Sequence, residues 1–135
     1  MFPETKMCLT ALENSTIDLL NESISLLDLC GIGSFKYYRR QNQIWLNNEL
    51  RRIFELSENE PLFFTMNEYF DTFVHPKDRE RLMKEANERV AKGIIEATFH
   101  YRVITWKGNI KNVVVKSFIM EEVNIGLIGV VKEVK

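Results

Sequence analysis

The sequence is poor in the side chains from which metal and redox sites are built. Its 135 residues include two cysteines, Cys8 and Cys30, and two histidines, His75 and His100. Two cysteines cannot form a disulfide framework, and the four side chains lack the spacing of metal ligands. We therefore expect no metal site and a reducing, cytoplasmic setting. Cys30 is interpreted as a small buried hydrophobe.

A charge excess of one sign and a long hydrophobic run are also missing. The formal net charge is -1, which gives no electrostatic reason to bind nucleic acid or an anionic membrane. No apolar run approaches the length of a membrane span, and the N-terminus lacks the basic-then-apolar layout of a signal peptide. The hydrophobic fraction is 45% and the charged fraction 27%, as in ordinary globular proteins. We expect one domain that contacts neither nucleic acid nor membrane.

The sequence contains no catalytic motif. No glycine-rich phosphate loop follows a predicted strand, and no serine or cysteine lies in a nucleophile motif. Nearly all acidic residues fall on predicted helix faces or turns, and the charged run over residues 77–92 is interpreted as a solvated face. We therefore expect no enzymatic activity in this chain, so that any catalysis would belong to a linked output domain.

The sequence is organised around residues 70–87, where an apolar cluster leads into a His-Pro pair. His75 marks a break between two helices, because residues before proline avoid the helical region. Pro76 suits the first turn of the second helix, Asp78 would complement the helix dipole, and Gly93 is a suitable end. The apolar stripe of this helix is predicted to consist of Leu82, Met83, Ala86 and Val90.

An amphipathic helix is predicted over residues 7–30. Two adjacent seams of aliphatic side chains run along it. The seam with heptad spacing consists of Leu12, Leu19 and Leu26, and the other of Ile17, Leu20, Ile24 and Leu27. Together they form a face wider than one contact requires. Either the helix lies on its own domain or one seam meets a second copy; we expect a parallel homodimer through the heptad seam.

In the rest of the chain, the spacing of apolar residues predicts an α+β fold with one antiparallel sheet and its helices on one face. The predicted elements are strands over 34–38 and 43–46, helices over 49–56 and 65–73, the helix after Pro76, and strands over 97–104, 110–120 and 125–134. Thr65 and Glu68 form a capping box. On the first meander strand, Phe99 and Tyr101 share the inner face, so His100 is expected to be exposed on the other.

Several short motifs occur together in one order. They are Gly31-Ile32-Gly33-Ser34-Phe35, Asn48-Glu49-Leu50, Phe73-Val74-His75-Pro76-x-Asp78-Arg79, Tyr101-Arg102-Val103, Lys107-Gly108-Asn109-Ile110 and Ile128-Gly129-Val130-Val131. With them, residues 31–135 resemble a PAS domain of the subfamily with a C-terminal PAC segment, preceded by the helix of residues 1–30. The resemblance implies a five-stranded antiparallel sheet in the order 2-1-5-4-3, with helices that cup a small cavity. It also implies a role in sensing a ligand, redox state or light for an output domain, often as a dimer.

Three departures from the family pattern stand out. Asn112 replaces a tryptophan that is frequent in the fourth strand, and Glu55 replaces a glycine that often follows the first helix. Glu133-Val134-Lys135 stands where the family closes with Asp-Ile-Thr, which puts the coupling to an output helix in doubt. Haem-binding relatives need a histidine within the long helix, and flavin-type light sensors need an Asn-Cys-Arg motif. Neither is present, so haem and flavin are not expected and the cofactor is left unknown.

The inner face of the sheet and the facing helices predict the lining of the cavity. The candidate lining residues are Phe54, Phe70, Phe99, Tyr101, Ser117 and Leu127. A ligand there is expected to be small and mostly apolar, with Tyr101 and Ser117 as its polar contacts. We favour a sensory and dimerisation module of a protein such as a histidine kinase or diguanylate cyclase, as in two-component systems. A ligand-free association scaffold is the alternative, and a small-molecule enzyme on a cone-shaped α+β fold is a third.

Overall fold

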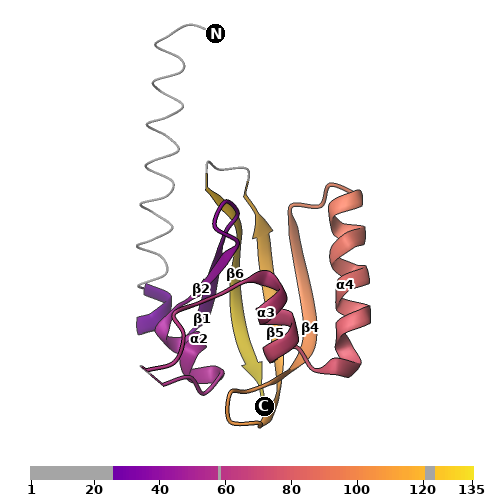
Figure 1. Cartoon of the computed structure of the whole chain (residues 1–135). Helices are drawn as coiled ribbons and strands as arrows, with labels where there is room; N and C mark the ends of the chain where they lie inside the picture. Colours follow the sequence, from indigo (N-terminus) through magenta and orange to yellow (C-terminus); the bar gives the residue numbers. More distant parts are fainter. Residues whose placement is uncertain (1–25, 58, 121–123) are drawn as a thin grey trace, which may run out of the picture.

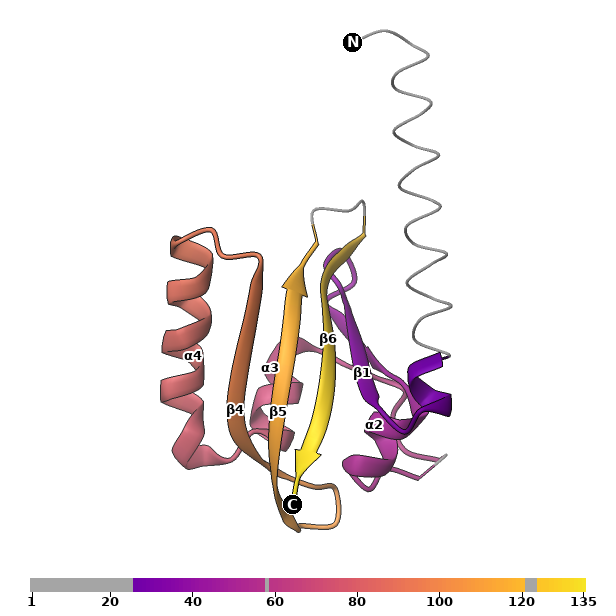
Figure 2. The ribbon, with the colours of Figure 1, turned by 180° about the vertical axis from the view of Figure 1, so that it is seen from behind.

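The chain forms one antiparallel sheet with helices packed against one of its faces. The computed structural model describes residues 26–57, 59–120 and 124–135. The strands are β1 (Gly33–Tyr38), β2 (Gln43–Leu46), β3 (Phe63–Phe64), β4 (Glu96–Ile104), β5 (Ile110–Ile119) and β6 (Ile125–Val134). The helices are α2 (Asn48–Ile53), α3 (Met66–Phe73) and α4 (Pro76–Ala91). Helix α3 lies in front of the strands in Figure 1 and behind them in Figure 2. The predicted α+β class is confirmed.

The sheet has six strands in the order β3-β2-β1-β6-β5-β4, so the prediction of five strands was wrong. The additional strand is β3, which pairs with β2 through Ile44–Phe64 and Trp45–Phe63. A strand of two residues is too short to show a period in the sequence. Strand β6 lies between β1 and β5, and this central place accounts for its near-continuous apolar sequence.

Local capping interactions fix where the helices begin. The Thr65 hydroxyl accepts a hydrogen bond from the Glu68 backbone N–H, and the Glu68 carboxylate accepts one from the Thr65 N–H. The predicted capping box is therefore confirmed. His75 precedes α4, where its Nδ1 accepts from the Lys77 N–H at 3.1 Å, which confirms it as a helix-boundary residue. The buried Asn47 side chain caps α2 and also bonds to Ser34 of β1.

Helix α2 ends at Ile53, three residues before the predicted end at Leu56. The cause is the backbone of Glu55, which has a φ of 60° in the left-handed region that stops a helix. Glycine adopts this conformation most readily, and here a glutamate adopts it. The Glu55 carboxylate accepts hydrogen bonds from Thr105 and from Asn109, the latter at 2.8 Å. These bonds join the end of α2 to the turn between β4 and β5.

The inward face of α4 differs from the predicted apolar stripe. Leu82 is buried as expected, but Met83 is 45% exposed and Val90 is 68% exposed. The charged residues Asp78 and Arg89 are buried instead. Compared with the predicted orientation, helix α4 is thus rotated about its axis, so that two charged side chains face the rest of the domain. The interpretation of residues 77–92 as a solvated face was wrong at these two positions.

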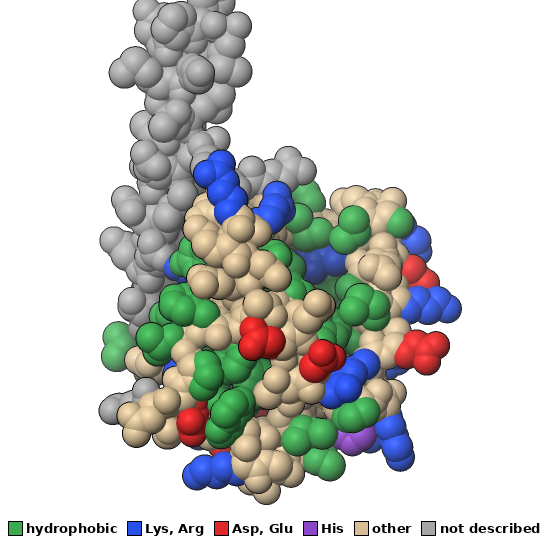
Figure 3. Space-filling view, in the orientation of Figure 1, with side chains coloured by type: hydrophobic (Ala, Val, Ile, Leu, Met, Phe, Trp, Pro, Cys, Tyr) green, Lys and Arg blue, Asp and Glu red, His purple; other side chains and the backbone are tan. Residues whose placement is uncertain are grey.

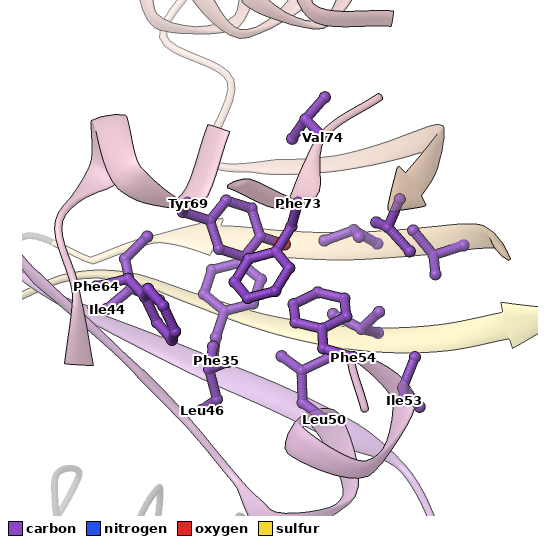
Figure 4. Close-up of a cluster of buried hydrophobic side chains, with 14 of the residues drawn as sticks. Phe35, Ile44, Leu46, Leu50, Ile53, Phe54, Phe64, Tyr69, Phe73 and Val74 are labelled. Atoms are coloured by element: carbon purple, nitrogen blue, oxygen red, sulfur yellow. The ribbon is translucent and has the colours of Figure 1, made fainter. Parts of the chain in front are cut away.

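Aromatic rings fill the part of the core next to α2 and α3 (Figure 4). Phe54 and Phe73 are stacked with their ring centres 4.4 Å apart, and Phe64 meets Phe73 edge-on at 5.1 Å. Leu50, Phe54 and Phe73 are fully buried. Ile53, at the end of α2, is also buried.

The segment before β1 is described only at its end. Residues 26–29 are helical, and most of the predicted dimer seam, including Leu12 and Leu19, lies outside the described residues. Cys30 follows in a turn and is exposed, so the prediction that it is buried was wrong; after the last helical turn its side chain faces away from the core. Within the described ranges, no helix is long and apolar enough to cross a membrane.

Candidate functional site

A cavity of about 140 Å³ lies between the inner face of the sheet and helices α3 and α4. Five of the six predicted lining residues surround it: Phe70, Phe99, Tyr101, Ser117 and Leu127. They come from α3, β4, β5 and β6. In the space-filling view, the face between α3 and α4 is hollowed. Hydrophobic side chains surround the hollow, and atoms of a lysine or arginine side chain lie within it (Figure 3).

Phe54 was also predicted to line the cavity, but it does not. It lies in the filled part of the core, where Phe73 stacks on it and Tyr69 lies between it and the cavity side, with its ring centre 5.9 Å from that of Phe54. The inward direction of Phe54 could be predicted, but its distance from the cavity depends on these two neighbours. Phe35, Ile44 and Met66 complete the wall at that end.

Two tyrosine hydroxyls supply polar groups at the cavity wall. The Tyr69 and Tyr101 hydroxyl oxygens are 2.9 Å apart and share a hydrogen bond. Burial raises the pKa of Tyr101 to about 12 and raises the pKa of Tyr69 well above its usual value. Both phenols are therefore protonated at neutral pH and act as hydrogen-bond donors or acceptors. Tyr69 was not identified from the sequence.

Arg89 is a second wall residue that the sequence did not reveal. It is 6% exposed, and its Nε donates to the Ile94 carbonyl at 3.1 Å. Its Nη2 donates to the Ser117 carbonyl at 2.8 Å and to the Ile95 carbonyl, and its Nη1 donates to the Ser117 hydroxyl. The guanidinium carbon lies 5.8 Å from the centre of the Phe99 ring. Arg89 thus joins the end of α4 to β5 at the wall of the cavity.

Among the described residues that line it, the cavity has no group suited to acid–base chemistry near neutral pH. Among its described wall residues the ionisable side chains are Tyr69, Arg89 and Tyr101. The raised pKa values keep both phenols neutral, and a general base needs a pKa nearer the working pH. In the described part of the chain, no group of histidine, cysteine and acidic side chains could hold a metal ion.

The start of α4 makes a separate polar cluster on the outer edge of β4. The Asp78 carboxylate accepts from the Arg102 backbone N–H at 2.8 Å and from the Arg102 guanidinium at 2.8 and 3.0 Å. The Arg102 carbonyl accepts from the His75 N–H, and the His100 carbonyl accepts from Arg81. The hydrogen bonds from Arg102 hold the pKa of Asp78 well below its usual range. Asp78 was expected on a solvated face, and its role depends on a strand 24 residues away.

Comparisons with known proteins address the fold. No protein-family model matches the chain, and no curated protein matches its sequence at a significant level. Solved structures do match it. The PAS domain of a protein from Colwellia psychrerythraea has a TM-score of 0.66 and 15% identity, over 86% of this chain and 97% of that one. A sensory box histidine kinase/response regulator from Burkholderia thailandensis has a TM-score of 0.65 and 15% identity, over 80% of each chain.

A third structure agrees with these two. The N-terminal domain of a diguanylate cyclase with a PAS/PAC sensor from Marinobacter aquaeolei has a TM-score of 0.61 and 11% identity, over 76% of this chain and 94% of that one. The chain has a PAS fold. The ordered motifs had predicted this fold although the identities to these structures are 11% to 15%.

The cavity of this PAS fold does not fit haem or flavin. No histidine or cysteine is among its described wall residues. Its volume of about 140 Å³ is below the roughly 300–1,000 Å³ of pockets for drug-sized ligands. His75 caps α4 outside the cavity. His100 is exposed, as predicted. Cys30 is exposed as well, contrary to the prediction.

Proposed function

We propose that this PAS fold is a sensory and dimerisation module that binds a small ligand and relays its presence to an output domain. The output domain would be a histidine kinase or a diguanylate cyclase, two kinds of protein that occur among its structural neighbours. The observation that carries the proposal is the apolar cavity beside a filled core. Protein interiors are close-packed, so a space of this size in a small domain favours a binding role.

The position of the cavity suggests how a ligand would act on the fold. Leu82, Ala86 and Arg89 of α4 form one wall, and Phe99, Val115 and Leu127 of the sheet form the opposite wall. A bound molecule would contact both walls at once. If it bound one arrangement of α4 against the sheet more tightly than another, it would shift the population toward that arrangement. Helix α4 is therefore the element that would respond to the ligand.

A titration with benzyl alcohol tests this proposal. We expect the probe to shift the backbone amide signals of residues around the cavity, measured by nuclear magnetic resonance. The matched control is Ala86→Leu, which adds side-chain volume to the α4 wall and should abolish the shifts. If the parent shows no shifts, or if Ala86→Leu binds equally well, the cavity does not bind the probe. The ligand-free scaffold would then be the better description.

The dimer part of the proposal rests on the helix before β1. At its described end, Leu26 is 60% exposed and Leu29 is 84% exposed, so the domain's own core does not cover them. Burying one such side chain contributes about 1.5–3 kcal/mol, and three or four would favour association with a second copy. This supports a homodimer contact through the heptad seam.

Sedimentation equilibrium of a double variant tests the dimer. Leu19→Glu with Leu26→Glu should give a folded monomer, whereas Ile110→Glu, at a site that is 60% exposed on β5, should leave the dimer intact. A double variant that stays dimeric would place the contact elsewhere. A double variant that unfolds would assign the seam to the domain's own core.

A further inference from the structure

Arg89 is a buried cation beside the cavity, and no carboxylate neutralises it within residues 26–57, 59–120 and 124–135. Its hydrogen bonds to described residues go to uncharged oxygens, namely three backbone carbonyls and the Ser117 hydroxyl. The ion pairs of the described chain involve other basic residues. Burial lowers the pKa of Arg89. Buried charges in proteins are normally paired, so the wall has a place for an anion.

Hydrogen-bond donors remain available at the same wall. A guanidinium has five N–H groups, and four of those of Arg89 have acceptors, which leaves one on Nη1 without an acceptor among the described residues. The Ser117 hydroxyl accepts from Arg89, and its own proton has no acceptor among the described residues. The paired hydroxyls of Tyr69 and Tyr101 likewise use one of their two protons. The polar part of the wall therefore offers donors and a positive charge.

The rest of the cavity is apolar and has the size of a small ring. Phe70, Leu82, Phe99, Val115 and Leu127 are among its apolar wall residues. The volume of about 140 Å³ is close to that of an engineered cavity of about 150 Å³ in another protein, which binds benzene. A ligand that matches this site has an apolar body of that size and one anionic acceptor group.

We propose that the cavity binds a small monocarboxylate with an apolar, ring-sized body. Its carboxylate accepts hydrogen bonds from Arg89 Nη1 and the Ser117 hydroxyl, and its body lies among Phe99, Phe70 and Leu127. This inference rests on the proposed function, because it assigns a ligand class to the same cavity. It replaces the expectation of a merely apolar ligand contacted by Tyr101 and Ser117 with an anionic one held by Arg89.

The test compares benzoate with benzyl alcohol, which share a ring and differ in the charge of the head group. Calorimetric titration of the full chain at constant pH and ionic strength should give an affinity for benzoate at least about tenfold higher, as expected for one charge-assisted hydrogen bond. Arg89→Met, which keeps the length and removes the charge, should lower the benzoate affinity to that of benzyl alcohol. Arg89→Lys should retain part of the preference.

The outcomes separate this inference from the proposed function. If benzyl alcohol binds as tightly as benzoate, the guanidinium has only a structural role and a carboxylate ligand is excluded. The proposed function as a sensory module would not be contradicted by that result. If neither probe binds, both proposals fail. If benzoate binds equally well to Ala86→Leu, it binds outside the cavity and the inference fails. Should Arg89→Met not fold, Ser117→Ala provides the second variant, and a benzoate preference unchanged in it would contradict the proposed contact.

Discussion

The two ends of the core are built in different ways. At the α2 end, Phe54, Phe64 and Phe73 pack ring against ring with centres 4.4 and 5.1 Å apart. At the α4 end, the helix and the sheet enclose a cavity, and polar contacts join them at both ends of the helix. Asp78 binds Arg102 near the start of α4, and Arg89 binds Ser117 near its end. Apolar packing therefore stabilises one end, whereas hydrogen bonds of charged side chains join the helix to the sheet at the other.

The largest expected effect comes from removing a ring at the filled end. Phe73→Ala should lower the free energy of unfolding by about 3–5 kcal/mol, because the ring is fully buried and leaves a cavity. Phe70→Ala, at the partly buried cavity wall, is the matched control and should cost less than half as much. Chemical denaturation measures both values. Equal losses would mean that the two ends do not differ in packing.

A smaller effect is expected from the ion pair at the start of α4. Asp78→Asn should cost about 1.5–3 kcal/mol near neutral pH, the range for hydrogen bonds to charged groups. The Arg102 side chain is partly exposed, which favours the lower part of that range. Chemical denaturation of both proteins at several pH values checks this.

The pH dependence follows from the lowered pKa of Asp78 in the folded state. Its stabilising contribution is fully present above the unfolded-state pKa of about 3.9 and is lost as the pH falls through the folded-state pKa. The difference in stability between the parent and Asp78→Asn should therefore shrink below about pH 4. A difference that stays constant from pH 7 to pH 3 would contradict the ion-pair assignment.

The effect of added side-chain volume should depend on where it is placed and be smallest at the cavity. A Cβ on Gly129 would lie 2.2 Å from Cε1 of Phe35, so Gly129→Ala should cost about 1–3 kcal/mol through overpacking. Ala86→Leu adds more volume but places it at the cavity, and leucine has nearly the helix propensity of alanine. We expect a change of less than about 1 kcal/mol. A larger loss for Ala86→Leu, measured by thermal or chemical unfolding, would mean that the cavity is not open to added atoms.

Features that depend on neighbouring residues could be predicted from the sequence. Thr65 and Glu68 cap each other within one turn, and Pro76 follows His75 directly. The alternation of β4 placed Phe99 and Tyr101 at the cavity, as the structure does. Successive side chains of a strand point to opposite faces of the sheet, so this part of the lining follows from local sequence.

Features that depend on distant residues could not be predicted. The acceptors of Arg89 lie at Ile94, Ile95 and Ser117, so a helical pattern that favours apolar residues selected Val90 for the inward face. β3 is too short to show a period. These elements are fixed by tertiary contacts, which override local preference.

The contacts between the start of α4 and β4 also bear on self-association. The backbone groups on the free edge of a sheet are a template to which a strand of another chain can add. Here the Arg102 carbonyl accepts a hydrogen bond from the His75 N–H, and the Arg102 N–H donates to the Asp78 carboxylate. The His100 carbonyl accepts from the Arg81 side chain. At the opposite edge, β3 offers only two residues. Both borders of the sheet are therefore blunted against edge-to-edge aggregation, and on the β4 side the residues that start α4 provide this protection.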